Sequence, residues 1–124
     1  DLMLIKNKIP FINENASLRK SINLINSKKL GVAIVRNKKN ETIGIFTDGD
    51  IKRAIQNKKS LDNLTIKSLM TKNPISVDKD ILAAKAIGIM HEKKITSLCV
   101  HNKSNIKKTI GILHIHNLIS ADIF

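Results

Sequence analysis

The sequence predicts an α+β fold made of two tandem β-α-β-β-α motifs, packed as a pseudo-two-fold symmetric pair. Two observations lead to this fold. An internal repeat covers most of the 124 residues. In each copy, a segment with helical apolar spacing lies between short segments that are typical of strands. Because a unit of about 55 residues buries little surface alone, the two copies are expected to pair their sheets around one core.

The hairpin strands are predicted where the repeat is clearest, in KKLGVAIVRNKKNETIGIFTDGDI (28–51) and KKITSLCVHNKSNIKKTIGILHIHNL (93–118). Both stretches open with two lysines and an apolar residue. Both continue into an apolar run that ends in valine, and both reach TIGI after a polar loop. The second loop is two residues longer, which a surface loop tolerates. The expected strands are 31–36 and 42–47 in the first copy, and 96–101 and 109–114 in the second.

A short strand and a helix are predicted before each hairpin, from the aligned segments 11–25 and 76–90. Both segments have apolar residues at i, i+4 and i+7, a spacing that builds one apolar helical face. Asn15 and Asp78 stand near the helix starts as N-cap candidates. The apolar positions are Leu18, Ile22 and Ile25 in one copy, and Leu82, Ala86 and Ile89 in the other. The expected strands are 10–12 and 75–77, and the expected helices are 16–28 and 80–92.

A last helix is predicted at the end of each copy, at 49–58 and 116–122. The stretch SLDNLTIKSLMTKNP (60–74) joins the copies, and Pro74 is expected to help stop a helix in this linker. The predicted organisation is a first motif at 1–60, a linker helix or entry segment at 61–73, and a second motif at 74–124.

The charge of the chain is strongly basic. It carries 22 Lys and Arg residues against 10 Asp and Glu, a net charge of +12. The lysines are spread along the whole chain, and there is no Tyr or Trp that could stack on bases. We therefore expect a general basic surface that favours anionic small molecules, and no nucleic-acid site.

The remaining composition indicates an ordered cytoplasmic protein without a membrane segment. Apolar residues make up 42% of the chain, which is enough for a core. No apolar run reaches the roughly 18 residues that span a bilayer. The start, DLMLIKNKIPF, is neither a signal peptide nor a transmembrane helix, and is typical of the cut edge of a longer protein. The single cysteine, Cys99, is expected in the core and fits a reducing compartment.

The repeated unit, with TIGIFTDGDI at its second strand-to-helix junction and LMTKNPISVDKD entering the second copy, resembles a tandem CBS domain pair, or Bateman module. LGVAIVRNKKNETIGIFTDGDIKRAI and HEKKITSLCVHNKSNIKKTIGILHIHNLISADI are further similar to the C-terminal regulatory region of the bacterial arabinose-5-phosphate isomerases. In that family a sugar-isomerase (SIS) domain precedes the CBS pair and performs the chemistry, which feeds synthesis of Kdo, a lipopolysaccharide sugar. The resemblance implies a regulatory module that is not itself an enzyme, attached to an SIS domain and assembling into homo-oligomers through its CBS pairs.

The resemblance also implies a ligand site. In CBS pairs ligands lie in clefts between the motifs, and the recurring pattern is Gly-apolar-apolar-Thr-x-x-Asp, which maps onto Gly44, Thr47 and Asp50. A glycine allows close backbone approach, a threonine at a helix N-terminus suits phosphate, and an ionised aspartate can accept two hydrogen bonds from a ribose diol. Arg53, one turn further, adds a candidate phosphate contact.

A structural interpretation of the same residues stays open. Thr47 or Asp48 would cap the helix, and Asp50 would complement the helix dipole in the first turn. The two roles are compatible, and Asp48 is expected either at the cap or at the rim of the ligand site.

The second copy departs from the pattern, with His114 and Asn117 at the positions of Thr47 and Asp50. His114 can donate a hydrogen bond and Asn117 can bond a diol without charge, so one asymmetric nucleotide-type ligand per pair is expected. The candidates are CMP-Kdo, as a pathway end product, or an adenosine nucleotide. His114 and His116 could converge on a strand, but no Cys or carboxylate set accompanies them, so no metal site is predicted.

Three other interpretations remain open at this stage. The module could be purely structural, dimerising and holding a tetrameric parent together with empty clefts. It could be the CBS pair of another parent, such as a transporter or a dehydrogenase. It could also bind nucleic acid. The sequence contains no catalytic constellation, and it leaves open the ligand base and the sign of regulation.

Overall fold

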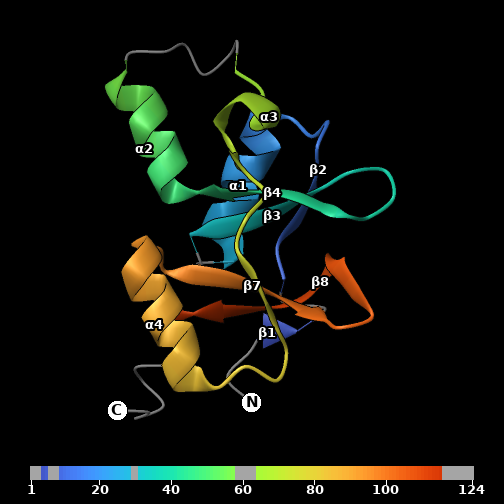
Figure 1. Cartoon of the computed structure of the whole chain (residues 1–124). Coiled ribbons are helices and arrows are strands. Elements are labelled where there is room, and N and C mark those ends of the chain that lie inside the picture. Colours follow the sequence, from blue (N-terminus) through green and yellow to red (C-terminus); the bar gives the residue numbers. More distant parts are fainter. Residues whose placement is uncertain (1–3, 6–8, 29–30, 58–63, 116–124) are drawn as a thin grey trace. The chain divides into compact units, whose positions relative to one another are not determined.

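The structure is a computed structural model that describes residues 4–5, 9–28, 31–57 and 64–115 (Figure 1). The described residues form two compact units. One, the 10–74 unit, runs from Pro10 to Pro74. The other, the 75–124 unit, also takes in the described residues of 1–9. Among the described residues, no helix is long and apolar enough to cross a membrane.

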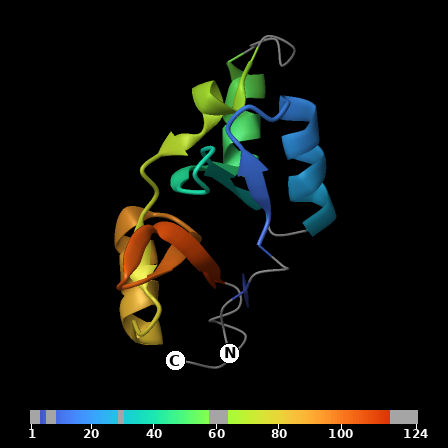
Figure 2. The same cartoon turned by 90° about the vertical axis from the view of Figure 1, so that its right-hand side faces the viewer.

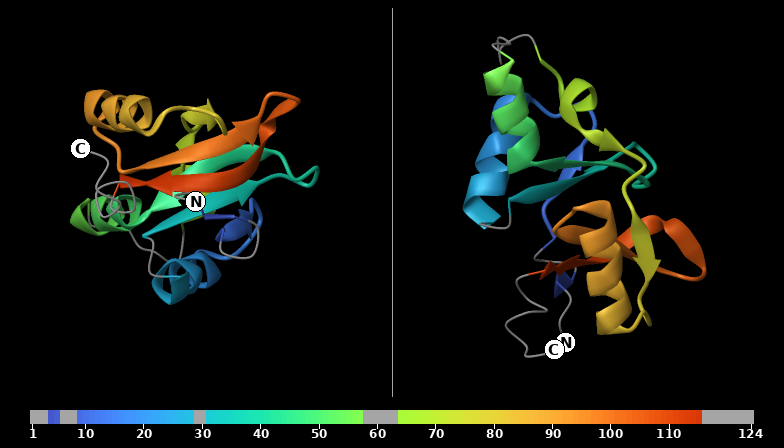
Figure 3. Two further views of the ribbon diagram at one scale, coloured as in Figure 1. Left: turned by 90° about the horizontal axis from the view of Figure 1, so that it is seen from below. Right: turned by 60° about the vertical axis from the view of Figure 1, so that its left-hand side comes forward.

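The 10–74 unit is a four-stranded mixed sheet with helices on one face. Strand order is β2-β3-β4-β5, with β2 and β3 parallel and the other pairs antiparallel. The helices α1 and α2 lie side by side along this sheet (Figures 2 and 3). The elements are β2 (Phe11–Asn13), α1 (Leu18–Lys28), β3 (Val32–Arg36), β4 (Thr42–Thr47), α2 (Asp48–Gln56), α3 (Ile66–Leu69) and β5 (Thr71–Lys72).

The core of the 10–74 unit follows the predicted periodicities. Ala33 and Val35 alternate along β3 and are fully buried, so they point to the face that the helices cover. Phe46 from β4 and Ile66 from α3 are also fully buried in the same cluster. The predicted apolar positions of the first helix contribute Leu18 and Ile25 as buried residues and Ile22 as a partly buried one.

The 75–124 unit repeats this arrangement, which confirms the predicted duplication. Its strand order is β1-β8-β7-β6, with β6 and β7 parallel and β8 antiparallel to both neighbours. Ala86 and Met90 of its helix pack on the sheet residues Leu98 and Val100. The elements are β1 (Leu4–Ile5), β6 (Ser76–Asp78), α4 (Ala83–Lys93), β7 (Ser97–Asn102) and β8 (Asn105–His114).

Two strands were not predicted. β1 lies at the start of the predicted first motif (1–60), but it pairs with β8 and belongs to the 75–124 unit. β5 lies in the linker and pairs with β4. The linker helix α3 ends at Leu69, and β5 separates it from Pro74. The prediction that Pro74 helps to stop this helix is therefore wrong; the helix ends because the chain turns extended at Met70, with ψ of 154°.

The second hairpin also differs from its prediction. Its turn consists of residues 103 and 104, because β7 and β8 extend to Asn102 and from Asn105. The two additional residues thus lie in the lengthened strand β8, whose register with β7 shifts between Val100 and Asn102. The predicted helix 116–122 lies outside the described residues.

The N-cap predictions for the first helix of each copy were wrong. Asn13 and Asp78 form equivalent turns. In each turn the side-chain Oδ1 accepts a hydrogen bond of 2.9 Å from the backbone amide two residues later in the chain. The cap of α1 is Ser17, whose Oγ accepts from the amide of Lys20. The N-cap of α4 is Leu82, which has no capping side chain and is 75% exposed, so it does not belong to the apolar face assigned to it.

Candidate ligand-binding site

The junction between β4 and α2 is built around a capping box. Thr47 ends the strand in extended conformation and is the N-cap of α2. Its Oγ1 accepts from the amide of Asp50 at 3.3 Å, and Asp50 Oδ2 accepts from the amide of Thr47 at 2.8 Å. Each side chain thus satisfies a backbone donor that the helix start would leave unpaired. The cap is Thr47, and the alternative that Asp48 caps the helix is wrong.

Asp50 is the buried polar centre of this junction. Its side chain is only 5% exposed, and every partner comes from its own helix or the residue before it. Oδ2 also lies 3.2 Å from the Thr47 hydroxyl, and Oδ1 pairs with Arg53 Nη2. A carboxylate this buried is stable when it is paired and hydrogen-bonded, and here the surrounding first turn of α2 supplies both.

Arg53 folds back over the first turn of α2. Its side chain is 64% exposed although it pairs with Asp50. A Cβ at Gly49 would lie 3.3 Å from Arg53 Nη1 and 3.5 Å from Thr47 Oγ1. The guanidinium thus passes close to the glycine backbone, where a larger residue would crowd it. The structure brings Thr47, Asp50 and Arg53 together in one cluster.

Gly44 and Asp48 lie near this cluster but have other contacts. Gly44 is buried in β4, and a Cβ there would lie 2.9 Å from Met70 Cγ. The missing side chain therefore makes room for the linker that crosses the strand. Asp48 is exposed, and its amide donates to the carbonyl of Gly31 at 3.0 Å. Gly31 has a φ of +70°, which favours glycine at this close approach.

The end of β8 in the second copy has the same backbone hydrogen bond as the end of β4 in the first copy, but its side chains differ. The amide of Ile115 donates to the carbonyl of Thr96 at 2.8 Å, as Asp48 does to Gly31 in the first copy. His114 is therefore in the position of Thr47, at the end of β8, as the sequence alignment predicts. Asn117 and His116 lie outside the described residues.

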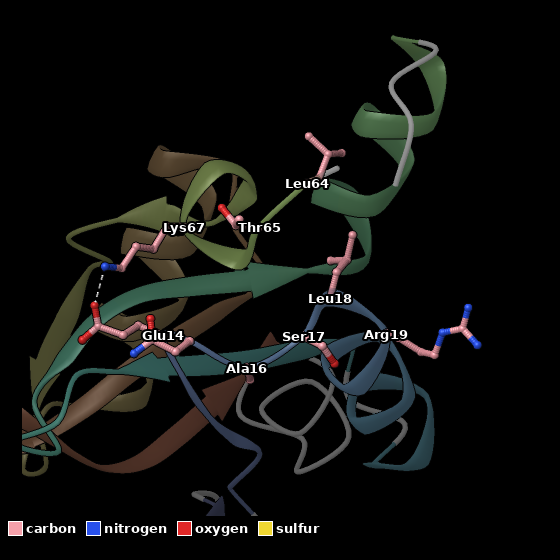
Figure 4. A pocket seen from close by; sticks show the side chains of 9 residues that line it. Glu14, Ala16, Ser17, Leu18, Arg19, Leu64, Thr65 and Lys67 are labelled. Atoms are coloured by element: carbon pink, nitrogen blue, oxygen red, sulfur yellow. Dashed lines mark ion pairs between the residues drawn. The ribbon is translucent and has the colours of Figure 1, made fainter. Parts of the chain in front are cut away.

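A pocket that the sequence analysis missed lies elsewhere in the 10–74 unit. It has a volume of about 490 Å³ and is lined by the start of α1 and by residues from Leu64 to Lys67 (Figure 4). Lys67 Nζ pairs with Glu14 Oε1 at 2.7 Å on its wall, while Arg19 extends away. The pocket lies at the start of α1, whereas Gly31, which contacts the β4–α2 junction, follows the end of α1. The length of this helix, about 16 Å, therefore separates the pocket from the junction. The Thr-x-x-Ser spacing of Thr65 and Ser68, which form a capping box, was the sequence signal for the wall that residues 64–67 form.

Three other polar groups, Cys99, Ser76 and His101, lie in the sheet of the 75–124 unit. Burial raises the pKa of the Cys99 thiol to about 11, against a smaller opposing effect of a hydrogen bond with Thr109. Cys99 is 1% exposed, so its predicted place in the core is confirmed. Ser76 Oγ and His101 Nδ1 lie 2.6 Å apart across two strands. Within the described ranges, no group of three or more His, Cys, Asp or Glu side chains could hold a metal ion.

Two sheets of this topology, each with a parallel β-α-β unit followed by an antiparallel hairpin, define a tandem repeat of one small motif. The model of the CBS domain family matches the chain at residues 1–57 and 66–123. The chain belongs to the CBS domain family and contains two tandem CBS motifs, as its resemblance implied.

Known proteins similar to this chain include a group of isomerases. The chain is 33% identical over 123 residues to arabinose 5-phosphate isomerase KdsD of Salmonella typhimurium. It is 37% identical over 123 residues to an uncharacterised protein of Rickettsia prowazekii. Both matches cover 99% of this chain and 37% of the relative, so the chain spans little more than a third of their length.

Solved structures with the same fold include two that were determined with AMP. One is the complex of the Arabidopsis thaliana protein CBSX2 with AMP. It has a TM-score of 0.84 at 22% identity, and the match covers 99% of this chain and 93% of that one. The complex of PAE2072 from Pyrobaculum aerophilum with AMP has a TM-score of 0.80 at 21% identity, covering 91% and 85%. At this identity the likeness shows the fold.

Proposed function

We propose that this CBS pair is a regulatory module that binds a nucleotide or a nucleotide-sugar and passes its occupancy to an attached sugar-phosphate isomerase. The carrying observation is the β4–α2 junction, where a buried carboxylate, a capping hydroxyl and a guanidinium meet at a helix N-terminus. The similarity to KdsD over 99% of the chain supports the isomerase parent. The AMP complexes of two proteins of the same fold support the ligand class.

The junction has groups that suit the ribose and the phosphate of a nucleotide. Asp50 is acceptor-only when ionised and can take hydrogen bonds from a ribose diol. The N-terminus of α2 beside Thr47 suits a phosphate, because the positive end of the helix dipole favours an anion there. The amides of Asp48 and Asp50 already donate to Gly31 and Thr47 in the free protein. Arg53 suits the same phosphate. The net charge of +12 would further favour an anionic ligand.

The second copy makes the proposed site asymmetric. His114 replaces the hydroxyl of Thr47, and Asn117 replaces the carboxylate of Asp50. We therefore assign one ligand per CBS pair, with Asp50 as its ribose anchor and the second copy in a weaker supporting role. Gly44, Asp48 and Asn117 stay predicted ligand residues of this proposal.

The ligand candidates are CMP-Kdo, as the end product of the lipopolysaccharide-sugar pathway, and an adenosine nucleotide. Regulation requires that the ligand bind one state of the parent more tightly than another. In this proposal an SIS domain of the parent performs the isomerisation, and the protein works in the cytoplasm where nucleotide-sugars are made. Ligand at saturation that leaves the activity of the full-length parent unchanged would contradict the regulatory role.

Calorimetric titration tests the ligand site directly. The 124-residue chain is titrated with AMP, CMP and CMP-Kdo, and the bound ligand is then titrated into Asp50→Asn. This variant keeps an oxygen that can accept from the Thr47 amide but loses the charge, so we expect about tenfold weaker binding. Asp80→Asn removes an exposed carboxylate elsewhere and should bind like the wild type. Equal affinity of Asp50→Asn and the wild type would refute Asp50 as the anchor.

A second proposed role is self-association of the module. Ile55 on α2 is 56% exposed, although it belongs to an otherwise polar helix surface. Since the resemblance to CBS pairs implies homo-oligomers, this exposed apolar residue is the candidate contact with a second copy. Light scattering of the chain should give a dimer that Ile55→Glu converts to a monomer. A wild-type monomer at concentrations of about 100 μM would exclude this role, since a specific dimer would be formed there.

A further inference from the structure

We infer that Arg53 makes the β4–α2 junction select phosphorylated nucleotides over nucleosides. In the free protein its guanidinium is paired with the Asp50 carboxylate, which a sugar diol needs as its hydrogen-bond acceptor. This inference rests on the proposed function and concerns the same site. It follows from three observations on the first turn of α2: the burial of Asp50, the partners of its two oxygens, and the fold-back of Arg53 over Gly49.

The carboxylate of Asp50 has little capacity left in the free protein. Oδ2 accepts from the amide and the hydroxyl of Thr47, and Oδ1 pairs with Arg53. The carboxylate is 5% exposed, whereas the arginine is 64% exposed. The movable member of this pair is therefore Arg53, and a ligand reaches Oδ1 by displacing its guanidinium.

Displacement has opposite consequences for charged and neutral ligands. A nucleoside diol that displaces Arg53 replaces a charge-assisted contact with neutral hydrogen bonds and leaves the guanidinium without its partner. A nucleotide supplies a phosphate that the guanidinium can pair with instead, in a fork geometry that matches phosphate oxygens. The pairing of Asp50 with Arg53 thus disfavours nucleosides and leaves nucleotides little affected.

The small size of Gly49 supports this exchange. A Cβ at this residue would lie 3.3 Å from Arg53 Nη1, so a side chain there would crowd the folded-back guanidinium. The glycine thereby lets one arginine adopt the Asp50-bound position and leave it without crossing a side chain.

The test is a comparison of two ligand pairs, AMP with adenosine and CMP with cytidine, titrated into the 124-residue chain. The wild type should bind the nucleotide of one pair at least about tenfold more tightly than its nucleoside. Arg53→Gln should bind the nucleotide about tenfold more weakly and the nucleoside several-fold more tightly, which brings the ratio close to one. Lys52→Gln is the matched control, because it removes one exposed positive charge from the same helix, and it should keep the wild-type ratio.

Each outcome decides between the two proposals. A wild-type chain that binds a nucleotide, with the same ratio in Arg53→Gln, overturns the role of Arg53 and leaves the proposed function standing. A wild-type chain that binds none of the four compounds, nor CMP-Kdo, overturns the proposed function itself. Should Arg53→Gln fail to fold by circular dichroism, Arg53→Lys replaces it. This variant keeps the charge without the fork, so an intermediate ratio supports the inference and a wild-type ratio refutes it.

Discussion

The two copies of the CBS motif hold the end of their second hairpin strand with an equivalent backbone hydrogen bond and with different side chains. Asp48 N donates to Gly31 O in the first copy, and Ile115 N to Thr96 O in the second, at 3.0 and 2.8 Å. At the strand end beside this bond stands Thr47 in one copy and His114 in the other. The comparison teaches that the backbone preserves the duplicated motif, while the side chains at its junction are free to specialise.

A second pair of equivalent positions shows the same divergence away from the junction. In the first copy, Arg36 lies over the ring of Phe11, 3.8 Å from its centre. In the second copy the same two strand positions hold His101 and Ser76, which share a 2.6 Å hydrogen bond. A cation–π pair and a hydrogen-bonded polar pair thus occupy one cross-strand position of the motif. The side chains of the two copies therefore differ also at a position away from the junction.

The largest expected difference between the copies concerns their cores. Phe46 is fully buried, and its counterpart Leu113 is partly buried. Phe46→Ala should lower the free energy of unfolding by about 3–5 kcal/mol, because it removes a large side chain and leaves a cavity. Leu113→Ala should cost about 2 kcal/mol or less, since solvent already reaches that side chain. Urea denaturation followed by circular dichroism measures both.

A loss for Leu113→Ala that equals the loss for Phe46→Ala would break this comparison. It would mean that the two strand ends are equally buried in solution. Ile45→Val is a suitable control, because it removes one methylene from a partly exposed position in the same strand and should cost about 1 kcal/mol or less.

The second expected difference depends on pH and concerns Cys99, whose counterpart in the first copy is Ile34. Burial raises the pKa of this thiol from 9.0 to about 11 in the folded protein. Because the unfolded thiol ionises at lower pH than the folded one, the protonated thiol stabilises the fold below pH 9, and this stabilisation is lost between pH 9 and 11. Cys99→Val, of similar size, has no such dependence.

The measurement compares the free energy of unfolding of the wild type and Cys99→Val at pH 8 and pH 10.5. The wild type should lose roughly 2 kcal/mol more than the variant between the two, since one pKa unit corresponds to about 1.4 kcal/mol. Parallel losses in both proteins would show that the thiol is not buried in solution. Lysines titrate in this range too, but they are common to both proteins and cancel in the comparison.

The sequence was sufficient for the elements that carry periodicity. The repeat located the hairpin strands and the helix before each hairpin, because apolar spacing and the shared TIGI segment are visible in both copies. β1 and β5 escaped prediction because two residues carry no period, and β1 pairs with a strand more than a hundred residues away. Pairing at that distance is decided by the tertiary fold, which local sequence does not show.

The candidate site was predictable in its residues and less so in its geometry. The Thr-x-x-Asp spacing of Thr47 and Asp50 fits a ligand site and a capping box equally well, and the structure shows the capping box. The fold-back of Arg53 depends on Gly49, whose open side no motif specified. Asn15 is a favoured residue type for an N-cap, but Asn13 forms a turn there and Ser17 caps the helix that begins at Leu18.

A smaller expected difference lies in the helix caps, where Ser17 of the first copy aligns with Leu82 of the second. Ser17→Ala should destabilise the protein by about 1 kcal/mol, because the Lys20 amide loses its partner. Leu82→Ser should stabilise it by up to about 1 kcal/mol, since Leu82 is exposed and α4 has no capping side chain. Thermal unfolding at neutral pH measures both. Stabilisation by Leu82→Ala equal to that by Leu82→Ser would assign the gain to the loss of an exposed leucine and contradict the capping argument.

The smallest expected difference concerns the middle of the same two helices, where Gly88 in α4 aligns with Asn23 in α1. Gly88 is exposed, and a Cβ there would meet nothing within 4 Å. Gly88→Ala should therefore stabilise the protein by roughly 0.5–1 kcal/mol, because alanine restricts the unfolded chain and favours the helix. Asn23→Ala, also at an exposed helix position, should gain less, since asparagine is a better helix former than glycine. A loss of stability in Gly88→Ala would show that this face of α4 is covered in solution, and light scattering of the variant would then tell whether a second copy covers it.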